Sequence, residues 1–221
     1  MNRMSNAMRS AGQVMILVLS LGVVAYAVVA YSVFALGTVV HPDMRAGFEA
    51  HRGAIYTHVF ASAVALLLGP IQFSVRLRSA RPGLHRWLGR TYLGLGVLVG
   101  GVAGFVMAFH AFGGQVSQLG FGCLAIAWLY TGARAYLAIR ARDLASHRRW
   151  MVRNFALTFA AVTLRLWLPA SVAAGMPFDL AYPAIAWLCW VPNALFAEVL
   201  LGRTAGHARA ALAQSQAQAR P

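Results

Sequence analysis

The sequence predicts an all-α polytopic membrane protein, a bundle of six transmembrane helices, and three observations lead to this fold class. Hydrophobic residues make up 60% of the 221 residues and charged residues only 11%, a composition more apolar than that of soluble domains. The hydrophobic residues form six runs of about 20 residues or slightly more, the length at which a helix crosses a hydrocarbon core of roughly 30 Å. Arginines cluster in alternate loops between these runs.

The six runs account for most of the chain and define a single domain, residues 1–204. The expected spans are residues 14–40, 54–75, 90–112, 117–139, 154–174 and 182–201. The first run follows a basic start, but it is about twice as long as the hydrophobic region of a signal peptide and lacks a clear cleavage site, so we expect an uncleaved span. The Ala- and Gln-rich segment 205–221 is expected to be a flexible cytoplasmic tail.

The basic side chains other than histidine are all arginines, and the formal net charge is +14. Most of them lie in segments that six alternating spans place on one side of the membrane: residues 3–9, 76–90, 140–153 and 203–220. The positive-inside rule assigns this side, and therefore both termini, to the cytoplasm. We expect these arginines to contact anionic lipid headgroups. Their position at the ends of apolar runs argues against a nucleic-acid-binding protein.

The third expected span is rich in glycine. Its glycines are Gly94, Gly96, Gly100, Gly101 and Gly104. Several are three or four positions apart, so they share one helix face and expose the backbone there. This face is expected to let a neighbouring helix approach closely; the alternative is a flat cofactor that lies against it.

Five segments together resemble a family of bacterial predicted membrane proteins, DUF2306 (domain of unknown function 2306). They are LGPIQF at 68–73, LHRWLGR at 84–90, HRRWMVR at 147–153, ALTFAAVTLR at 156–165 and WLCWVPN at 187–193. The resemblance covers about the second to sixth spans. It implies a multi-pass protein of the bacterial inner membrane and no established chemistry.

Histidines form two groups, one on each side of the membrane. His85 and His147 open the third and fifth spans in similar settings, His-Arg-Trp and His-Arg-Arg-Trp, whereas His58 and His110 lie near the outer ends of the second and third spans. Two histidines on different helices, with arginines nearby for the propionates, are what a bis-imidazole haem b requires. All four are therefore candidate haem ligands. The alternative is that His85 and His147, beside their tryptophans, anchor helix ends at headgroup depth.

The pairing of a third-span with a fifth-span histidine is also similar to that of the six-span di-haem cytochromes b, which move electrons from ascorbate across membranes. The chain differs from those proteins because its fourth span has no histidine. His58 would therefore have to pair with His110.

Arg165 is the most deeply placed charge, about 12 residues or roughly 18 Å from the cytoplasmic end of the fifth span. Burying an arginine there costs about 2.5–3.5 kcal/mol on insertion scales, so it should face the bundle interior. The expected partner at this depth is Asn193, with the carbonyls freed by Pro169 and Pro192. No acidic side chain lies at the same depth. Arg165 and Asn193 are therefore candidate ligand-binding residues for an anion; the alternative is an arginine satisfied by carbonyls and water.

Two further sets of polar residues lie in or beside the expected spans. Glu198 is expected to form a structural ion pair with Arg134 or Arg153, with a proton-relay carboxylate as the alternative. On the outer side, polar residues offer nitrogen and oxygen ligands: His41, Asp43, Glu49, His51 and His58. They form no fixed metal-binding motif, and no metal site is predicted.

The sequence assigns no reaction, because it has no phosphate-binding glycine loop, GxSxG elbow or HExxH motif. Three hypotheses for its function remain. The first is a haem b-binding membrane electron-transfer protein. The second is a small transporter or a lipid- or anion-binding protein that uses Arg165. The third is a non-catalytic accessory subunit that packs against another membrane protein, or against a second copy of itself.

Overall fold

The structure is a computed structural model that describes residues 2–218, with the side chains of residues 11–204 and Gly206. All regular elements in this range are helical. The long helices and their segments are α1 (Asn2–Ser32), α3 (Arg52–Gln72), α5 (Pro82–Thr91), η2 (Tyr92–Val99), α6 (Gly100–Ala108), α7 (Gly114–Arg140), α8 (Leu144–Thr158), α9 (Ala160–Ala173), α10 (Phe178–Leu188) and α11 (Val191–Gln218). Three short elements connect them: η1 (Pro42–Met44), α2 (Arg45–Ala50) and α4 (Val75–Ala80).

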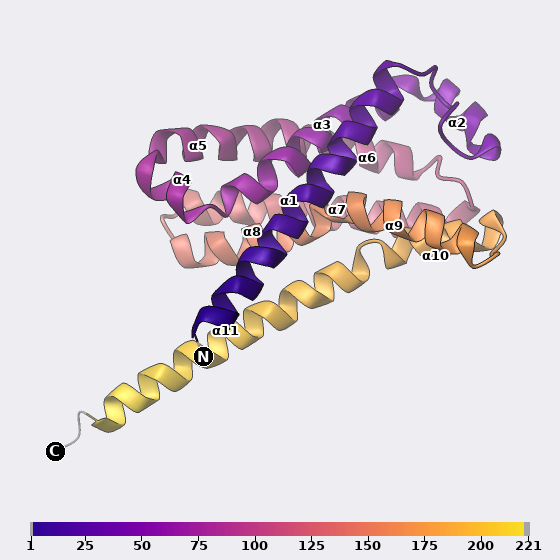
Figure 1. The fold of residues 1–221 in the computed structure, drawn as a ribbon. Helices are drawn as coiled ribbons and strands as arrows, with labels where there is room; N and C mark the ends of the chain where they lie inside the picture. Colours follow the sequence, from indigo (N-terminus) through magenta and orange to yellow (C-terminus); the bar gives the residue numbers. More distant parts are fainter. Residues whose placement is uncertain (1, 219–221) are drawn as a thin grey trace.

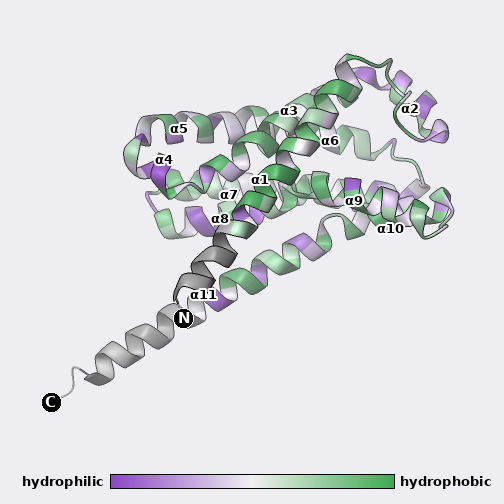
Figure 2. Ribbon diagram, viewed as in Figure 1, coloured by the Kyte–Doolittle hydropathy of each residue, from purple (hydrophilic) through white to green (hydrophobic). Residues whose placement is uncertain are grey.

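Within the described residues, six stretches are long and apolar enough to cross a membrane, which confirms the predicted fold class. They are Ala11–Ser32, Arg52–Gln72, Pro82–Ala108, Gly114–Arg140, Leu144–Ala173 and Phe178–Thr204. The third consists of α5, η2 and α6 in series, the fifth of α8 and α9, and the sixth of α10 and the first half of α11. Figure 2 shows hydrophobic residues along these helices and hydrophilic residues gathered around α2 and α4.

The spans alternate in direction, so the connecting segments gather at two ends of the bundle (Figure 1). One end carries α4, the start of α8 and both chain termini; we call it the arginine-rich end, because residues 76–90 and 140–153 lie there. The other carries α2 and the loops that precede α7 and α10, and we call it the opposite end. The expected flexibility of residues 205–221 stays a prediction, and residues 219–221 lie outside the described chain.

The first helix ends earlier than expected, at Ser32 rather than near residue 40. The residues that follow are apolar, but they form turns around Gly37, whose φ is +88°. A side chain at Gly37 would be strained by this backbone conformation, and its Cβ would lie 2.7 Å from Cγ of Arg45. Hydropathy alone does not detect a turn whose residues are nearly as apolar as the helix.

The third and fifth spans begin earlier than expected, at Pro82 and Leu144. Pro82 is the first residue of α5, where its missing N–H is not needed. Asp143 caps α8 by accepting a hydrogen bond from the Ser146 amide over 2.9 Å, and this bonding lowers the pKa of the Asp143 carboxyl. The first turns of both helices are polar, so the expected spans omitted them. As a result, His85 and His147 lie within helices rather than at their boundaries.

The glycine face of the third span packs closely against α3, as the sequence predicts. A Cβ added at Gly96 would lie 2.8 Å from Cβ and 3.0 Å from the backbone of Ala65. At Gly100 it would lie 3.0 Å from Oγ of Ser62, and at Gly104 it would lie 2.7 Å from Nδ1 of His58. Since these glycines are four residues apart, they form one line of contact along the helix.

Candidate functional site

A cavity of about 390 Å³ lies among α1, α3, α6, α7, α8, α9 and α10. It extends toward the opposite end of the bundle, where Asp43, Gly47 and His51 line it. Its walls are largely apolar and aromatic, with a few polar groups directed inward, among them Arg165 and His58. A cavity of this size with a small number of convergent polar groups is the usual form of a small-molecule site.

Arg165 places a positive charge at the wall of the cavity. Few groups of the chain interact with its guanidinium. Its Nη1 donates a hydrogen bond of 2.9 Å to the carbonyl of Ala161, and its guanidinium lies 5.4 Å from the ring centroid of Tyr26. The Nε atom is buried and has no hydrogen-bond partner among the described residues. Arg165 is eight residues from the end of α9, about 12 Å along the helix, so it lies nearer the opposite end than the arginine-rich end, as the sequence suggested.

His58 is the second polar group of the cavity. It lies on α3, in the second span, whereas Arg165 lies on α9, in the fifth. Its Nδ1 donates to the carbonyl of Gly100 over 2.8 Å, so the neutral ring presents Nε2 as an acceptor. Tyr31, His58 and Arg165 all line this cavity. Gly104 makes room for the imidazole, since a Cβ there would overlap it.

The mouth of the cavity is formed by two histidines and one acidic residue. The rings of His51 and His110 stack with their centroids 3.7 Å apart and their planes at 21°. Asp43 is the one acidic side chain among the described lining residues, and its carboxylate lies 3.5 Å from Nδ1 of His41. His110 stacks on His51, whereas Nδ1 of His58 bonds to the Gly100 carbonyl and leaves Nε2 as an acceptor, so the pairing of His58 with His110 stays a prediction.

A buried hydrogen-bond network lies behind the inner wall of the cavity; we call it the floor network. The hydroxyl of Tyr92 donates to Oδ1 of Asn154 over 2.7 Å and lies 2.9 Å from Oγ1 of Thr158. The indole of Trp128 also donates to Oγ1 of Thr158, over 2.9 Å. Asn154 in turn donates to the carbonyl of Trp128 and to Oγ1 of Thr131. Trp128 and Thr158 line the cavity, so the network fixes the position of its wall.

Sequence reasoning did not single out this network. Its members come from three spans, and each is a single polar or amphipathic residue in an apolar run. The available signal was Asn154, since an amide inside a span needs partners. The π-helical geometry of η2 begins at Tyr92, and π-helical segments are frequent at functional sites.

Asn193, the predicted partner of Arg165, has a different role. Its Nδ2 donates to Oγ1 of Thr163 over 3.1 Å and to the carbonyl of Cys189 over 3.0 Å. Cys189 lies in the break between α10 and α11, three residues before Pro192. Thr163 and Arg165 are two residues apart on α9, so they point in directions about 200° apart. The structure therefore does not bring Arg165 and Asn193 together.

His85 and His147 lie on α5 and α8, in the segments at the arginine-rich end, and neither lines the cavity. Nδ1 of His147 bonds to the carbonyl of Ala135 over 2.9 Å, which leaves its Nε2 as an acceptor. Nδ1 of His85 is buried and has no hydrogen-bond partner among the described residues.

The remaining polar residues considered in the sequence are Glu198 and the possible metal ligands. The predicted ion pair of Glu198 is confirmed with Arg153: Nε and Nη2 donate to the two carboxylate oxygens over 2.6 and 2.8 Å. Arg134 instead lies over the Trp150 ring, 4.9 Å from its centroid. In the described part of the chain, no three histidine, cysteine or acidic side chains are grouped so as to hold a metal ion.

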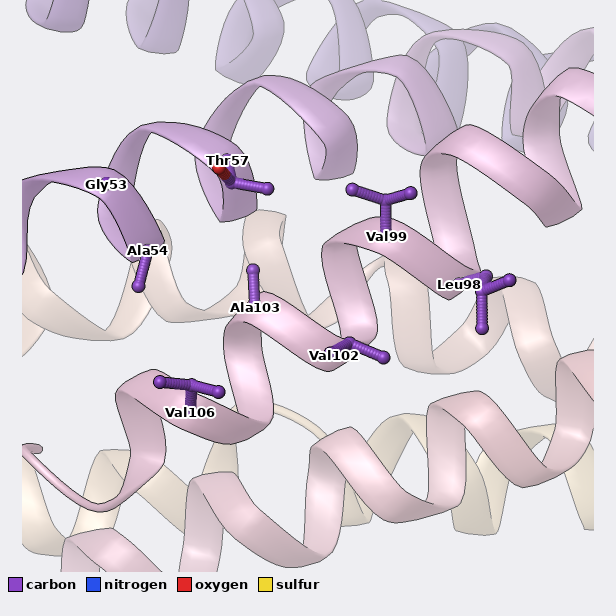
Figure 3. A pocket seen from close by; sticks show the side chains of 8 residues that line it. All are labelled: Gly53, Ala54, Thr57, Leu98, Val99, Val102, Ala103 and Val106. Atoms are coloured by element: carbon purple, nitrogen blue, oxygen red, sulfur yellow. The ribbon is translucent and has the colours of Figure 1, made fainter.

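A second hollow, of about 370 Å³, lies on the lipid-facing surface between α3 and the segment that η2 and α6 form. Figure 3 shows the short side chains that line it, including Thr57, Val102 and Val106. Thr57 carries the one polar side chain among them. Its described lining therefore offers one hydroxyl and no charged side chain.

Comparison with known proteins matches residues 55–201 to the model of one family, described as DUF2306, predicted membrane protein. The match covers well over half of the chain. The chain belongs to the DUF2306 family. No curated protein and no solved structure matches it.

The DUF2306 region contains most of the cavity. It includes His58, Arg165, Tyr182 and the whole floor network. The mouth residues His51 and Asp43, and Tyr31 on α1, precede the matched residues. In this DUF2306 protein, the inner part of the cavity is therefore built from residues of the family region. The preceding segment of the chain, with α1 and α2, supplies the remaining lining residues.

Proposed function

We propose that this membrane protein binds a small anionic ligand in the cavity around Arg165. The single observation that carries the proposal is the unpartnered, buried Nε of Arg165 at a cavity wall. A buried guanidinium is costly unless hydrogen bonds and an opposite charge compensate it. The one acidic residue among the described lining residues, Asp43, is at the mouth beside His41. An anion that enters the cavity would supply the missing partner.

The proposal includes a location. We place the protein in a bacterial inner membrane, with the arginine-rich end and both termini in the cytoplasm and the mouth of the cavity on the outer side. The support is the positive-inside rule applied to the arginine clusters. Exposed arginines such as Arg76, Arg86 and Arg90 would then lie beside anionic lipid headgroups. Binding and release of the ligand on one side would suit a receptor or a transporter.

Replacing Arg165 by glutamine tests the proposal. Benzoate and inorganic phosphate are added to the detergent-purified protein, and the thermal midpoint of unfolding is followed, since a ligand that binds only the folded state raises it. We expect at least one of the two anions to stabilise the wild type. The R165Q variant should bind that anion about 10- to 100-fold more weakly, because a hydrogen bond to a charged group contributes about 1.5–3 kcal/mol.

Arg140→Gln is the matched control, because Arg140 is exposed at the end of α7 and bonds to Tyr136 outside the cavity. This variant should bind the anion as the wild type does. Equal stabilisation of the wild type and R165Q, or no stabilisation of the wild type by either anion, would overturn the proposal.

Haem b between His85 and His147 is a second candidate function. The observation that favours it is the hydrogen bond from Nδ1 of His147 to the Ala135 carbonyl, because ligating histidines commonly hold their second nitrogen in this way. His85 has no such partner among the described residues. His58 and His110 are the weaker candidate pair for a second haem, because the ring of His110 stacks on that of His51.

A reduced-minus-oxidised visible spectrum tests the haem hypothesis on protein purified from cells supplied with a haem precursor. The expected result is a sharp Soret band with α and β bands at near-stoichiometric haem, lost in His147→Ala and kept in His110→Ala. A colourless, well-folded protein would exclude electron transfer through haem at this site. An accessory, non-catalytic role stays a prediction.

A further inference from the structure

We infer that the ligand is a flat aromatic monocarboxylate, with its carboxylate against Arg165 and its ring among the aromatic walls of the cavity. This inference rests on the proposed function and names the chemical class of the ligand. It is drawn from the charge, the hydrogen-bonding groups, the walls and the size of the cavity.

The charge of the cavity favours a monoanion. Arg165 is the one arginine among its described lining residues. The acidic Asp43 lies at the mouth, where it would disfavour the entry of a ligand with several negative charges. A dianion such as a phosphate monoester would also leave one charge without a partner in a membrane interior, which is costly.

The hydrogen-bonding groups favour a carboxylate. Nε of Arg165 is an unused donor. The hydroxyls of Tyr31 and Tyr182, which also line the cavity, form no hydrogen bond with other described residues. All three donors line the same cavity, and a carboxylate has two oxygens that accept several hydrogen bonds.

The walls and the volume favour an aromatic body. Phe121, Trp128 and Tyr182 line the cavity together with Leu124 and Leu164. Aromatic walls bind flat rings through offset or edge-to-face packing in addition to burial of apolar area. The volume of about 390 Å³ is within the range of roughly 300–1,000 Å³ of small-molecule pockets. Acetate or inorganic phosphate would leave most of it unfilled.

Four probes test this inference on the full chain in lipid nanodiscs: 1-naphthoate, 1-naphthalenemethanol, acetate and inorganic phosphate. Dissociation constants are measured by isothermal titration calorimetry. We expect 1-naphthoate to bind at least tenfold more tightly than each of the other three, because only it combines the ring with the charge. R165Q should reduce the affinity for 1-naphthoate to that for the alcohol.

Ala161→Leu is a second variant, which fills the cavity, because Ala161 lines it. Ala170→Leu is the matched control on the exposed side of the same helix, α9. The first variant should weaken 1-naphthoate binding at least tenfold, and the second should leave it unchanged. Equal weakening by both would overturn the placement of the ring.

The outcomes separate the inference from the function on which it rests. If acetate or phosphate binds as tightly as 1-naphthoate and R165Q weakens it, the ligand class is wrong and anion binding at Arg165 stands. If the alcohol binds as tightly as 1-naphthoate and R165Q changes neither, both are wrong. Failure of all four probes to bind the wild type overturns both as well.

Discussion

Gly96→Leu is expected to lower the free energy of unfolding by about 3 kcal/mol, the upper part of the range for an overpacked core. A Cβ at Gly96 would lie 3.0 Å from the backbone N and Cα of Ala65. A backbone atom cannot rotate away as the end of a side chain can, so η2 and α3 would have to separate along their whole contact. Titration with SDS in mixed micelles, followed by circular dichroism, measures this loss.

Gly94→Leu is the matched control. Gly94 lies two residues away on η2, is exposed, and has no heavy atom within 4 Å of an added Cβ. A leucine there would face lipid and favour helix formation, so the stability should be unchanged or higher. A small effect of Gly96→Leu would mean that the two helices are not held at this distance.

Separation of η2 from α3 in Gly96→Leu would also change the shape of the cavity. Gly100 and Gly104 continue the contact line toward Ser62 and His58. If η2 and α3 move apart, the hydrogen bond between His58 and the Gly100 carbonyl lengthens, and the imidazole loses its fixed orientation. We therefore expect Gly96→Leu to weaken ligand binding at Arg165 as well, although Gly96 is outside the cavity.

Asn154→Leu has the second large expected effect. The amide forms hydrogen bonds with Tyr92, with the carbonyl of Trp128 and with Thr131, and it is fully buried. Hydrogen bonds between membrane helices contribute about 0.6 kcal/mol on average, so the loss of three should cost about 2 kcal/mol. The same SDS titration measures it, and benzoate affinity should also fall, because Trp128 and Thr158 form part of the cavity wall.

Two threonine variants serve as references for Asn154→Leu. Thr158→Val keeps the shape of the side chain and removes the hydroxyl that accepts from Trp128 and contacts Tyr92, so it should also be clearly destabilising. Thr204→Val removes an exposed hydroxyl that bonds only to the Leu200 carbonyl of its own helix, and it should have little effect. If Thr158→Val and Thr204→Val were equally mild, the network would not stabilise the fold.

The sequence predicted the helices better than their ends. Hydropathy located all six spans, because crossing a membrane requires a run of apolar residues of fixed length. It placed the end of the first helix near residue 40 rather than at Ser32, because the turn around Gly37 is itself apolar. It omitted the first turns of α5 and α8, which are polar helix beginnings with Pro82 and Asp143 as their signals.

The sequence also named some contacts correctly and missed others. The ion pair of Glu198 with Arg153 was among the expected pairs, because opposite charges at similar depths in a helix bundle tend to pair with one another. Depth also suggested Asn193 as the partner of Arg165. Depth does not specify rotation about the helix axis, and Asn193 bonds to Thr163 on another side of α9.

By itself, the sequence determined the class of the protein, its six spans, the alternation of its loops, its glycine contact face and its family, since these depend on length, composition and spacing within one helix. The tertiary structure decided which polar groups come together: Arg165 and His58 line one cavity, His51 stacks on His110, and Asn154 bonds to Tyr92. Each residue turns a helix by about 100°, so a small difference in rotation or tilt changes the partner across the bundle. Spacing along the chain does not contain that information.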